Sequence, residues 1–303
     1  MLMFYSLGEI LIDIFQKEGQ ELLGGTSANF CTTISKLGGN ASIITKIGKA
    51  DSGKIIKELT SLGVNTSQII VDPIHPTGKV IISSVNGNSL CERRKLCADC
   101  YISEEEIDVN SFSSGDVLHF CSFALRECST KYSLQKAIDY MLSKGGKIAF
   151  DINLRLRQWK NVSECKVAIN TALARTHYLK ASEEDLWLFS NKSLEEIISS
   201  FFAFSQTLSV VILTKGEKGS ELYTRDGEVF YSRRYDTPVV DTTGAGDCLF
   251  ATAVLLLSKP IYNYQEILDI STAASAIQMQ KLGSLEGIPS MEQIEEFLEN
   301  YIQ

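Results

Sequence analysis

Residues 238–257 read PVVDTTGAGDCLFATAVLLL, and this stretch decides the fold. The apolar residues 238–240 predict a strand, and the apolar run 248–257 predicts a buried helix. The first N–H groups of such a helix have no partner within it and carry partial positive charge. Gly244 and Gly246 lie in the loop between these elements and let several N–H groups converge on one anion. The stretch therefore predicts an anion site at the start of a helix.

Asp247 lies at the entrance of this helix, beside the predicted anion. A carboxylate opposes anion binding, but it is useful if a hydroxyl attacks the anion and must lose its proton. The alternative interpretation is a glycine turn and a helix that polar residues cap. The loop lacks the lysine of GxxxxGK[ST], and Leu249 replaces the third glycine of GxGxxG, so neither of these phosphate loops is present.

Composition limits the class of protein. A chain of 303 residues with 44% hydrophobic residues can form one large or two ordinary domains with a substantial core. A net charge of −8 argues against a nucleic-acid partner. Apolar runs shorter than ~18 residues and an N-terminus without a basic flank predict neither a membrane span nor a signal peptide. Eight cysteines in mostly apolar contexts favour a reduced, cytoplasmic protein.

One of the cysteine patterns is a CxxC at residues 97–100. It lacks the second pair or nearby histidines that a zinc site needs, so we do not predict a metal or redox centre there.

Alternating strand and helix patterns predict a parallel sheet at residues 38–71 and 117–153. Residues 77–84 and 88–96 differ, because no helix separates them, and they predict a β-hairpin. We predict a single α/β domain over residues 1–303, with a mostly parallel sheet flanked by helices. A small β-lid formed by about 10–23 and 77–99 extends from it.

The DTTGAGD stretch, followed by a helix of small residues, resembles the C-terminal signature of the ribokinase-like (PfkB) sugar kinases. Other stretches are most similar to bacterial fructokinases, and the resemblance extends from Gly8 to about Pro289. It implies a three-layer αβα fold and ATP-dependent phosphorylation of a sugar hydroxyl, with fructose as the expected sugar. Mg²⁺ would bridge the phosphates of ATP.

Three further motifs concern the sugar. Residues 8–13 match GE-x-L-x-D, residues 24–29 match GG-x-x-x-N, and residues 151–159 resemble D-P-N-x-R-x-x-x-W with Ile152 in place of proline. The resemblance implies a substrate site lined by Asp13, Gly24, Gly25, Asn29, Arg94 and Arg155. The alternative interpretations are a solvent-facing strand residue for Asp13, a glycine loop for residues 24–29 and a solvated charge run for residues 93–95.

The remaining site residues are also implied by the resemblance. The transferring phosphoryl group would lie on Gly244, Ala245 and Gly246, and Asp247 would take the proton. The nucleotide would lie along Ser182, Thr214, Gly216, Gly219 and Ser271. Residues 182–185 occupy the place of an N-x-x-E motif, so Asp185 or Glu184 would hold Mg²⁺ through water. Asp241 and Thr243 would help to hold a monovalent cation such as K⁺. An acidic first helical turn explains residues 182–185 equally well.

The substrate stays open at this stage. A kinase of 2-keto-3-deoxygluconate, ribose or a ribonucleoside is an alternative within the class, and a non-catalytic sugar- or nucleotide-binding regulator is an alternative outside it. The presence of Asp247 with both loop glycines favours the kinase. Exposed edges of the lid also suggest a homodimer that pairs two lids.

Overall fold

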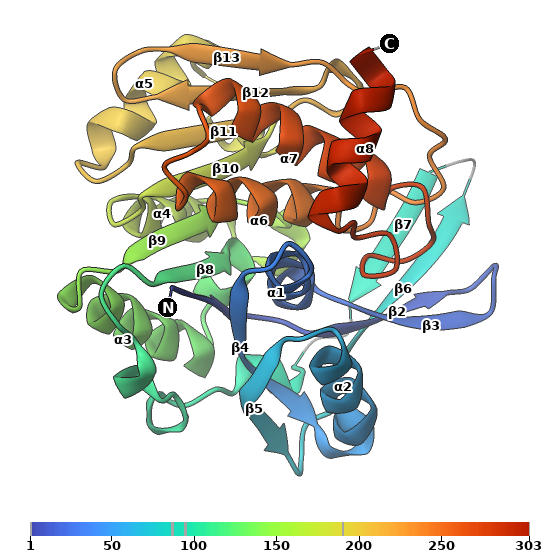
Figure 1. The fold of residues 1–303 in the computed structure, drawn as a ribbon. Helices are drawn as coiled ribbons and strands as arrows, with labels where there is room; N and C mark the ends of the chain where they lie inside the picture. Colours follow the sequence, from blue (N-terminus) through green and yellow to red (C-terminus); the bar gives the residue numbers. More distant parts are fainter. Residues whose placement is uncertain (1, 86–87, 94–95, 190, 303) are drawn as a thin grey trace.

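The computed structural model describes residues 2–85, 88–93, 96–189 and 191–302. Within this part of the chain, nine strands form one sheet in the order β13-β12-β11-β10-β9-β8-β1-β4-β5 (Figure 1). Seven neighbouring strands are parallel: β5 (Asn65–Asp72), β4 (Asn40–Gly48), β1 (Met3–Leu7), β8 (Val117–Cys121), β9 (Lys147–Asp151), β10 (Tyr178–Ser182) and β11 (Val210–Thr214). An antiparallel hairpin, β12 (Ser220–Thr224) and β13 (Val229–Ser232), completes one edge.

Helices cover both faces of this sheet. One face carries α1 (Thr26–Lys36), α2 (Lys49–Ser61), α6 (Ala245–Leu257), α7 (Tyr264–Gln278) and α8 (Met291–Ile302), which share one apolar core. The other face carries α3 (Ser129–Ser143), α4 (Val162–Leu173) and α5 (Leu194–Phe204), which share a second core. Successive strand residues point to opposite faces, so Phe4 packs in the first core and Tyr5 in the second. The predicted three-layer α/β fold is confirmed.

The direction of strand order reverses beside β1. The chain first adds β4 and β5 on one side of β1 and then returns to add β8 and β9 on the other. Ligands in open α/β sheets bind outside the carboxyl ends of the strands at such a reversal. We therefore expect the ligand site among the segments that follow β1, β8, β9 and β10.

A second, four-stranded sheet extends beside the central one (Figure 1). Its order is β3 (Gln20–Gly24), β2 (Leu11–Phe15), β6 (Gly78–Val85) and β7 (Asn88–Arg93), and only the β2–β6 pair is parallel. We propose that this sheet acts as a lid over the sugar. Arg94, which we predicted near the sugar, lies outside the described residues.

The strand predicted at residues 238–240 is wrong. Residues 233–240 are all described and form no strand, and Val239 and Val240 are 45% and 59% exposed. The central sheet already ends at β13, and the segment instead reaches the end of α7, where the Val240 N–H donates to the Met279 carbonyl at 2.9 Å. Two β-branched residues after a proline predict an extended backbone, but pairing needs an available strand beside them.

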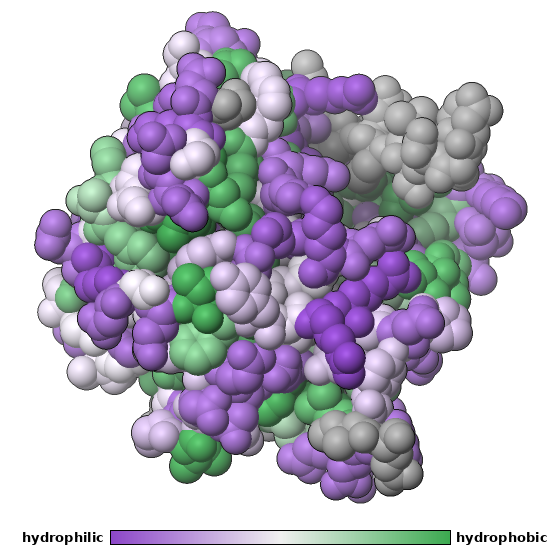
Figure 2. All heavy atoms as spheres, turned by 90° about the horizontal axis from the view of Figure 1, so that it is seen from above, coloured by the Kyte–Doolittle hydropathy of each residue, from purple (hydrophilic) through white to green (hydrophobic). Residues whose placement is uncertain are grey.

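Hydrophilic side chains cover much of the face in Figure 2, with smaller hydrophobic areas between them. Among the described residues, the helices fall short of the length and apolar character that crossing a membrane requires.

Candidate active site

The glycine loop and the start of α6 form the centre of the site. Gly244 is the residue before the helix and has φ +80°, a conformation that favours glycine. A Cβ atom at Gly244 would lie 2.6 Å from the Ser284 Cβ and 3.0 Å from the Asn29 Nδ2. The loop therefore needs glycine both for its backbone and for the close approach of α1 and residue 284.

Asp247 lies in the first turn of α6 and contacts α1. Its Oδ2 accepts a hydrogen bond from the Asn29 Nδ2 at 2.7 Å. Burial raises the pKa of Asp247, while the Asn29 hydrogen bond and the positive charge of Lys180 oppose that shift. The Asn29 Oδ1 is buried and has no hydrogen-bond partner within the described part of the chain. Asn29 thus orients the carboxylate and keeps one acceptor available.

The Asp13 side chain reaches diagonally across the β2–β3 pair to Gly24, because Asp13 is the register partner of Leu22 and Gly24 that of Leu11. A Cβ atom at Gly24 would lie 2.3 Å from the Asp13 Oδ2 and 2.9 Å from the Ser284 Oγ. Ser284 therefore lies between Gly24 and Gly244, which joins the Asp13 side of the site to the glycine loop. Burial and then the charge of Asp241 raise the pKa of Asp13 to about 7. Gly25, with φ +99°, would place a Cβ atom 2.7 Å from the Glu9 carbonyl oxygen.

An ion pair that the sequence interpretation missed lies on the other side of the loop. The Lys180 Nζ donates to both carboxylate oxygens of Asp151 at 3.0 Å, and both side chains are buried. A Cβ atom at Gly246 would lie 2.9 Å from that Nζ. A lysine within a buried strand is rare unless it is paired, so the run HYLKAS could have indicated a functional charge.

Glu9 is a second carboxylate that we did not predict as a site residue. It follows β1, is 6% exposed and accepts a hydrogen bond from the Cys121 Sγ at 3.6 Å. Its negative charge raises the pKa of Asp247. The carboxyl ends of β1 and β8 therefore meet close to the proposed proton acceptor.

Asp185 holds together the loops that follow β9 and β10. Its Oδ2 accepts from the Ser182 N–H at 2.7 Å and the Ser182 Oγ at 2.8 Å, and its Oδ1 accepts from the Leu154 N–H at 2.6 Å. Glu184 is exposed. Mg²⁺ in kinases uses one or two carboxylates together with water and phosphate oxygens. Both Asp185 oxygens already accept hydrogen bonds, so Mg²⁺ held through water by Glu184 or Asp185 stays a proposal. The described residues contain no cluster of three His, Cys, Asp or Glu that could hold a metal by itself.

Asp241 fixes the shape of the glycine loop. Its Oδ1 accepts from the Thr243 N–H at 3.0 Å and the Thr243 Oγ1 at 2.7 Å, and its Oδ2 accepts from the Gly283 N–H at 3.0 Å. The Gln278 side chain also donates to the Thr243 carbonyl at 2.8 Å. These bonds join the loop to the end of α7. A monovalent cation at Asp241 and Thr243 stays a proposal.

Of the predicted nucleotide residues in β11, the following turn and α7, two are accessible and two are buried. Thr214 ends β11, and Gly216 is exposed with open space around its Cα. Gly219 is buried, and a Cβ atom there would lie 2.1 Å from the Ser232 carbonyl oxygen, so backbone packing requires this glycine. Ser271 is fully buried and donates to the Ile267 carbonyl at 2.6 Å, so it is not brought to an open surface.

Arg155, which we predicted as a substrate residue, is exposed, and its charge lowers the pKa of Asp247.

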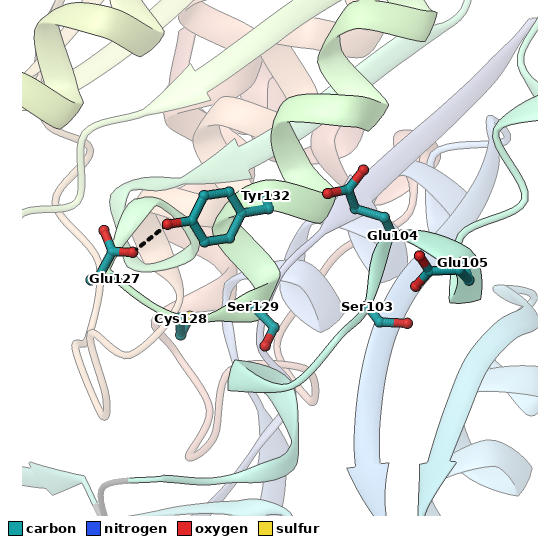
Figure 3. Close-up of a pocket in the computed structure, with 7 residues that line it drawn as sticks. All are labelled: Ser103, Glu104, Glu105, Glu127, Cys128, Ser129 and Tyr132. Atoms are coloured by element: carbon teal, nitrogen blue, oxygen red, sulfur yellow. Dashed lines mark hydrogen bonds between the residues drawn. The ribbon is translucent and has the colours of Figure 1, made fainter.

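Figure 3 shows a surface pocket of about 440 Å³ that has other lining residues. It is lined by Ser103, Glu104, Glu105, Glu127, Cys128, Ser129 and Tyr132, none of which we predicted as a site residue. The Tyr132 hydroxyl donates to Glu127 at 2.6 Å. Cys97 and Cys100 of the CxxC are both buried.

The three-layer fold, with a glycine loop and a carboxylate at the start of α6, is that of the ribokinase-like class of α/β proteins. The chain belongs to the pfkB family of carbohydrate kinases, whose family model matches residues 13–291. The 5-dehydro-2-deoxygluconokinase of Bacillus subtilis (strain 168) is 28% identical over 284 residues, covering 91% of this chain and 86% of the relative. A fructokinase of Vibrio alginolyticus is 29% identical over 259 residues, covering 83% of each.

Solved structures agree over nearly the whole chain. The fructokinase from Vibrio cholerae O395, bound to fructose, ADP and calcium ion, superposes with a TM-score of 0.87 at 26% identity and covers 98% of this chain and 99% of its own. A protein from E. coli provisionally named Ribokinase II, solved with ATP and Mg²⁺, gives a TM-score of 0.89 at 25% identity and covers 99% and 100%. The predicted resemblance to PfkB sugar kinases is therefore confirmed.

Proposed function

We propose that this chain transfers the γ-phosphoryl group of ATP to a hydroxyl of a small sugar, with fructose as the leading substrate. The observation that carries the proposal is the Asn29–Asp247 contact of 2.7 Å at the start of α6. It joins a proton acceptor to a loop suited to a phosphoryl group. Asp13 reaches the same site through Ser284 and supplies acceptors for sugar hydroxyls.

The reaction then follows from the roles of these groups. Asp13 and Asn29 orient the sugar, and the N–H groups at Gly244, Ala245 and Gly246 hold the transferring phosphoryl group. The sugar oxygen bonds to phosphorus as the bond to the ADP oxygen breaks, and the hydroxyl proton passes to Asp247. ADP leaves, and Asp247 later releases its proton to solvent.

Metal ions contribute charge. Mg²⁺ would neutralise charge on the ATP phosphates, and Glu184 and Asp185 are the residues placed to hold it through water. K⁺ beside Asp241 and Thr243 would stabilise the glycine loop. Ser182, Thr214 and Gly216 are the proposed nucleotide contacts.

A second substrate has support of its own. Relatives named 5-dehydro-2-deoxygluconokinase are as similar to this chain as the fructokinases are, at 28% and 29% identity. A deoxy sugar acid is therefore the second candidate, ahead of ribose and ribonucleosides. A carboxylate on the substrate would be complementary to an exposed cation such as Arg155.

The test is an ADP-release assay with Mg·ATP over fructose, 5-dehydro-2-deoxygluconate, 2-keto-3-deoxygluconate, ribose and adenosine. We expect kcat/KM for fructose or the sugar acid to exceed that for the other compounds by at least tenfold. Asp247→Asn provides the matched control for contaminating kinases. A thermal shift with sugar but no ADP release by the parent protein would favour the non-catalytic regulator instead.

A further inference from the structure

We propose that Lys180 is a positioning residue for phosphoryl transfer, whose buried ammonium group supports the glycine loop and holds Asp247 in its ionised, proton-accepting form. This inference rests on the proposed kinase function and assigns a role to a side chain outside the motifs that suggested that function.

The contacts of Lys180 place its charge directly against the loop. Lys180 projects from β10, and its side chain is buried. A Cβ atom at Gly246 would lie 2.9 Å from the Lys180 Nζ and 3.3 Å from its Cε. The ammonium group therefore packs on the backbone of the residue that precedes Asp247. Asp151 accepts two hydrogen bonds from an ammonium group with three donors, which leaves one donor for the loop side.

Stability alone does not explain this ion pair. Removing two charges from water costs more free energy than their attraction usually returns, and apolar replacements of buried ion pairs are often neutral or stabilising. Burial lowers the pKa of Lys180, but the charges of Asp151, Asp185 and Asp247 and the hydrogen bonds to Asp151 together raise it by more, so the lysine stays protonated. The charged ammonium group of Lys180 is thus held against the loop that is proposed to bind the phosphoryl group.

Most of the titratable groups around Asp247 are acidic, so the ionisation of Asp247 depends on the few cations nearby, of which Lys180 is the buried one. Burial and the charge of Glu9 raise the pKa of Asp247. Several other acidic groups interact electrostatically with Asp247: Asp13, Asp151, Cys121 and Cys248. Two cations, Lys180 and Arg155, oppose them. Arg155 is exposed and screened by solvent, whereas Lys180 is buried. His119 adds no charge, because burial and then Lys180 lower its pKa to about 3.

Loss of Lys180 and loss of Asp151 should shift the pH dependence of kcat in opposite directions. The proton acceptor works only when it is ionised, so kcat falls as the pH decreases through the pKa of Asp247. An opposite charge nearby lowers a carboxyl pKa by about 1–3 units, so loss of Lys180 should move the acidic limb of the kcat profile upward by about one unit or more. Loss of Asp151 removes a negative charge and should move the limb downward.

The experiment compares Lys180→Met, Asp151→Asn and the double variant by kcat from pH 5.5 to 9. Lys180→Met alone leaves a buried carboxyl group without its partner, so thermal unfolding is measured for every variant; the double variant removes both charges. We expect Lys180→Met to lose tenfold or more in kcat at pH 6 and to regain most of it at pH 9. The double variant should show a smaller loss, because removal of the Asp151 charge offsets part of the shift. The KM of both variants for sugar and for ATP should stay within threefold of the parent value.

A second measurement does not depend on turnover. Carbon NMR of protein labelled at the aspartate carboxyl carbon follows the titration of Asp247, which is assigned by comparison with Asp247→Asn. We expect the Asp247 midpoint to rise in Lys180→Met, to fall in Asp151→Asn and to lie between these two values in the double variant. An unmoved midpoint and kcat limb, or a loss of ATP affinity as the only effect, would overturn the proposal. If the parent protein phosphorylates no sugar, the proposed function fails, while the titration still decides the role of Lys180.

Discussion

At the scale of single residues, the site contains carboxylates whose burial is costly without a ligand. Asp13 is 4% exposed, and burial together with Asp241, Glu286 and Asp247 raises its pKa from 3.8 to about 7. The unfolded carboxyl ionises near pH 4, whereas the folded one keeps its proton to about pH 7. The stability contributed by this proton is complete below the unfolded pKa and is lost as the pH rises to about 7.

Asp13→Asn should therefore separate stability from binding. Without sugar, the variant should have a Tm a few degrees above that of the parent protein at pH 8 and a smaller change in Tm between pH 5 and 8. Sugar hydroxyls donate to the ionised carboxylate, so parental sugar affinity should increase through pH 7, and the variant should lose both this increase and most of its affinity. Calorimetric titration and thermal unfolding at four pH values measure these effects. Unchanged sugar affinity in the variant would contradict the role of Asp13.

Asp241 in the glycine loop and Asp247 in the first turn of α6 should respond differently to the same change. Asp247→Asn keeps size and polarity and cannot accept the proton, so we expect near-normal binding and a kcat lower by about 10²–10⁴-fold. Asp241→Asn weakens the bonds to Thr243 and Gly283, so it should raise KM for both substrates. Steady-state kinetics distinguish the two outcomes. Turnover of Asp247→Asn within about threefold of the parent rate would assign the proton to another group.

At the scale of elements, the turn between β11 and β12 gives a matched pair of glycines. Gly216 has φ +55° with open space around it, so Gly216→Ala should lower stability by only about 1–2 kcal/mol while raising KM for ATP, if the nucleotide lies there. Gly219 has φ +89° and would bring a Cβ atom against the Ser232 carbonyl oxygen, so Gly219→Ala should lower the Tm much more. Thermal unfolding and ATP kinetics test both variants. An unchanged KM for ATP in Gly216→Ala would place the nucleotide elsewhere.

Local sequence patterns predicted the helices and strands whose formation depends on the spacing of apolar residues and on glycines nearby in the chain. The apolar run 248–257 and the glycines before it predicted α6, and alternating strand and helix patterns predicted the parallel sheet. Residues 238–240 looked like a strand because they are apolar and partly β-branched, but strand pairing depends on a neighbour that the pattern cannot show. Lys180 was missed for a related reason, because its role depends on Asp151, which lies 29 positions earlier in the neighbouring strand β9.

At the scale of the whole molecule, the site exists only because distant segments meet. Asn29 and Asp247 are 218 positions apart, and Ser284 joins Gly24 to Gly244. Spacing within each motif could not predict these contacts, and only the resemblance to a family indicated that the motifs share one site. Glu9 belongs to the GE-x-L-x-D match, from which we took only Asp13 as a site residue. Ser284 carries no signal of its own in the sequence, since a serine after a glycine is common.

The four-stranded sheet leads to a prediction about assembly. Ile14 and Ile81 are register partners in the β2–β6 pair, and both are partly exposed. They point to the face opposite Asp13 and Val80, because successive strand residues alternate between faces. This apolar face and the edges at β3 and β7 need cover. We therefore expect a homodimer that pairs two such sheets at micromolar concentration.

Ile14→Asp tests this prediction without touching the sugar site. A charge on the outer face of the sheet should give monomers, because an unpaired carboxylate in an apolar interface is costly. The side chain of residue 14 faces away from Asp13, so sugar affinity of the monomer should stay within a few-fold of the parent value. Val239→Asp, at a 45% exposed valine distant in sequence from the sheet, is the matched control and should leave the assembly unchanged. Light scattering across a hundredfold range of concentration measures the mass, and a parent protein that is monomeric throughout would remove the dimer while leaving the kinase site as proposed.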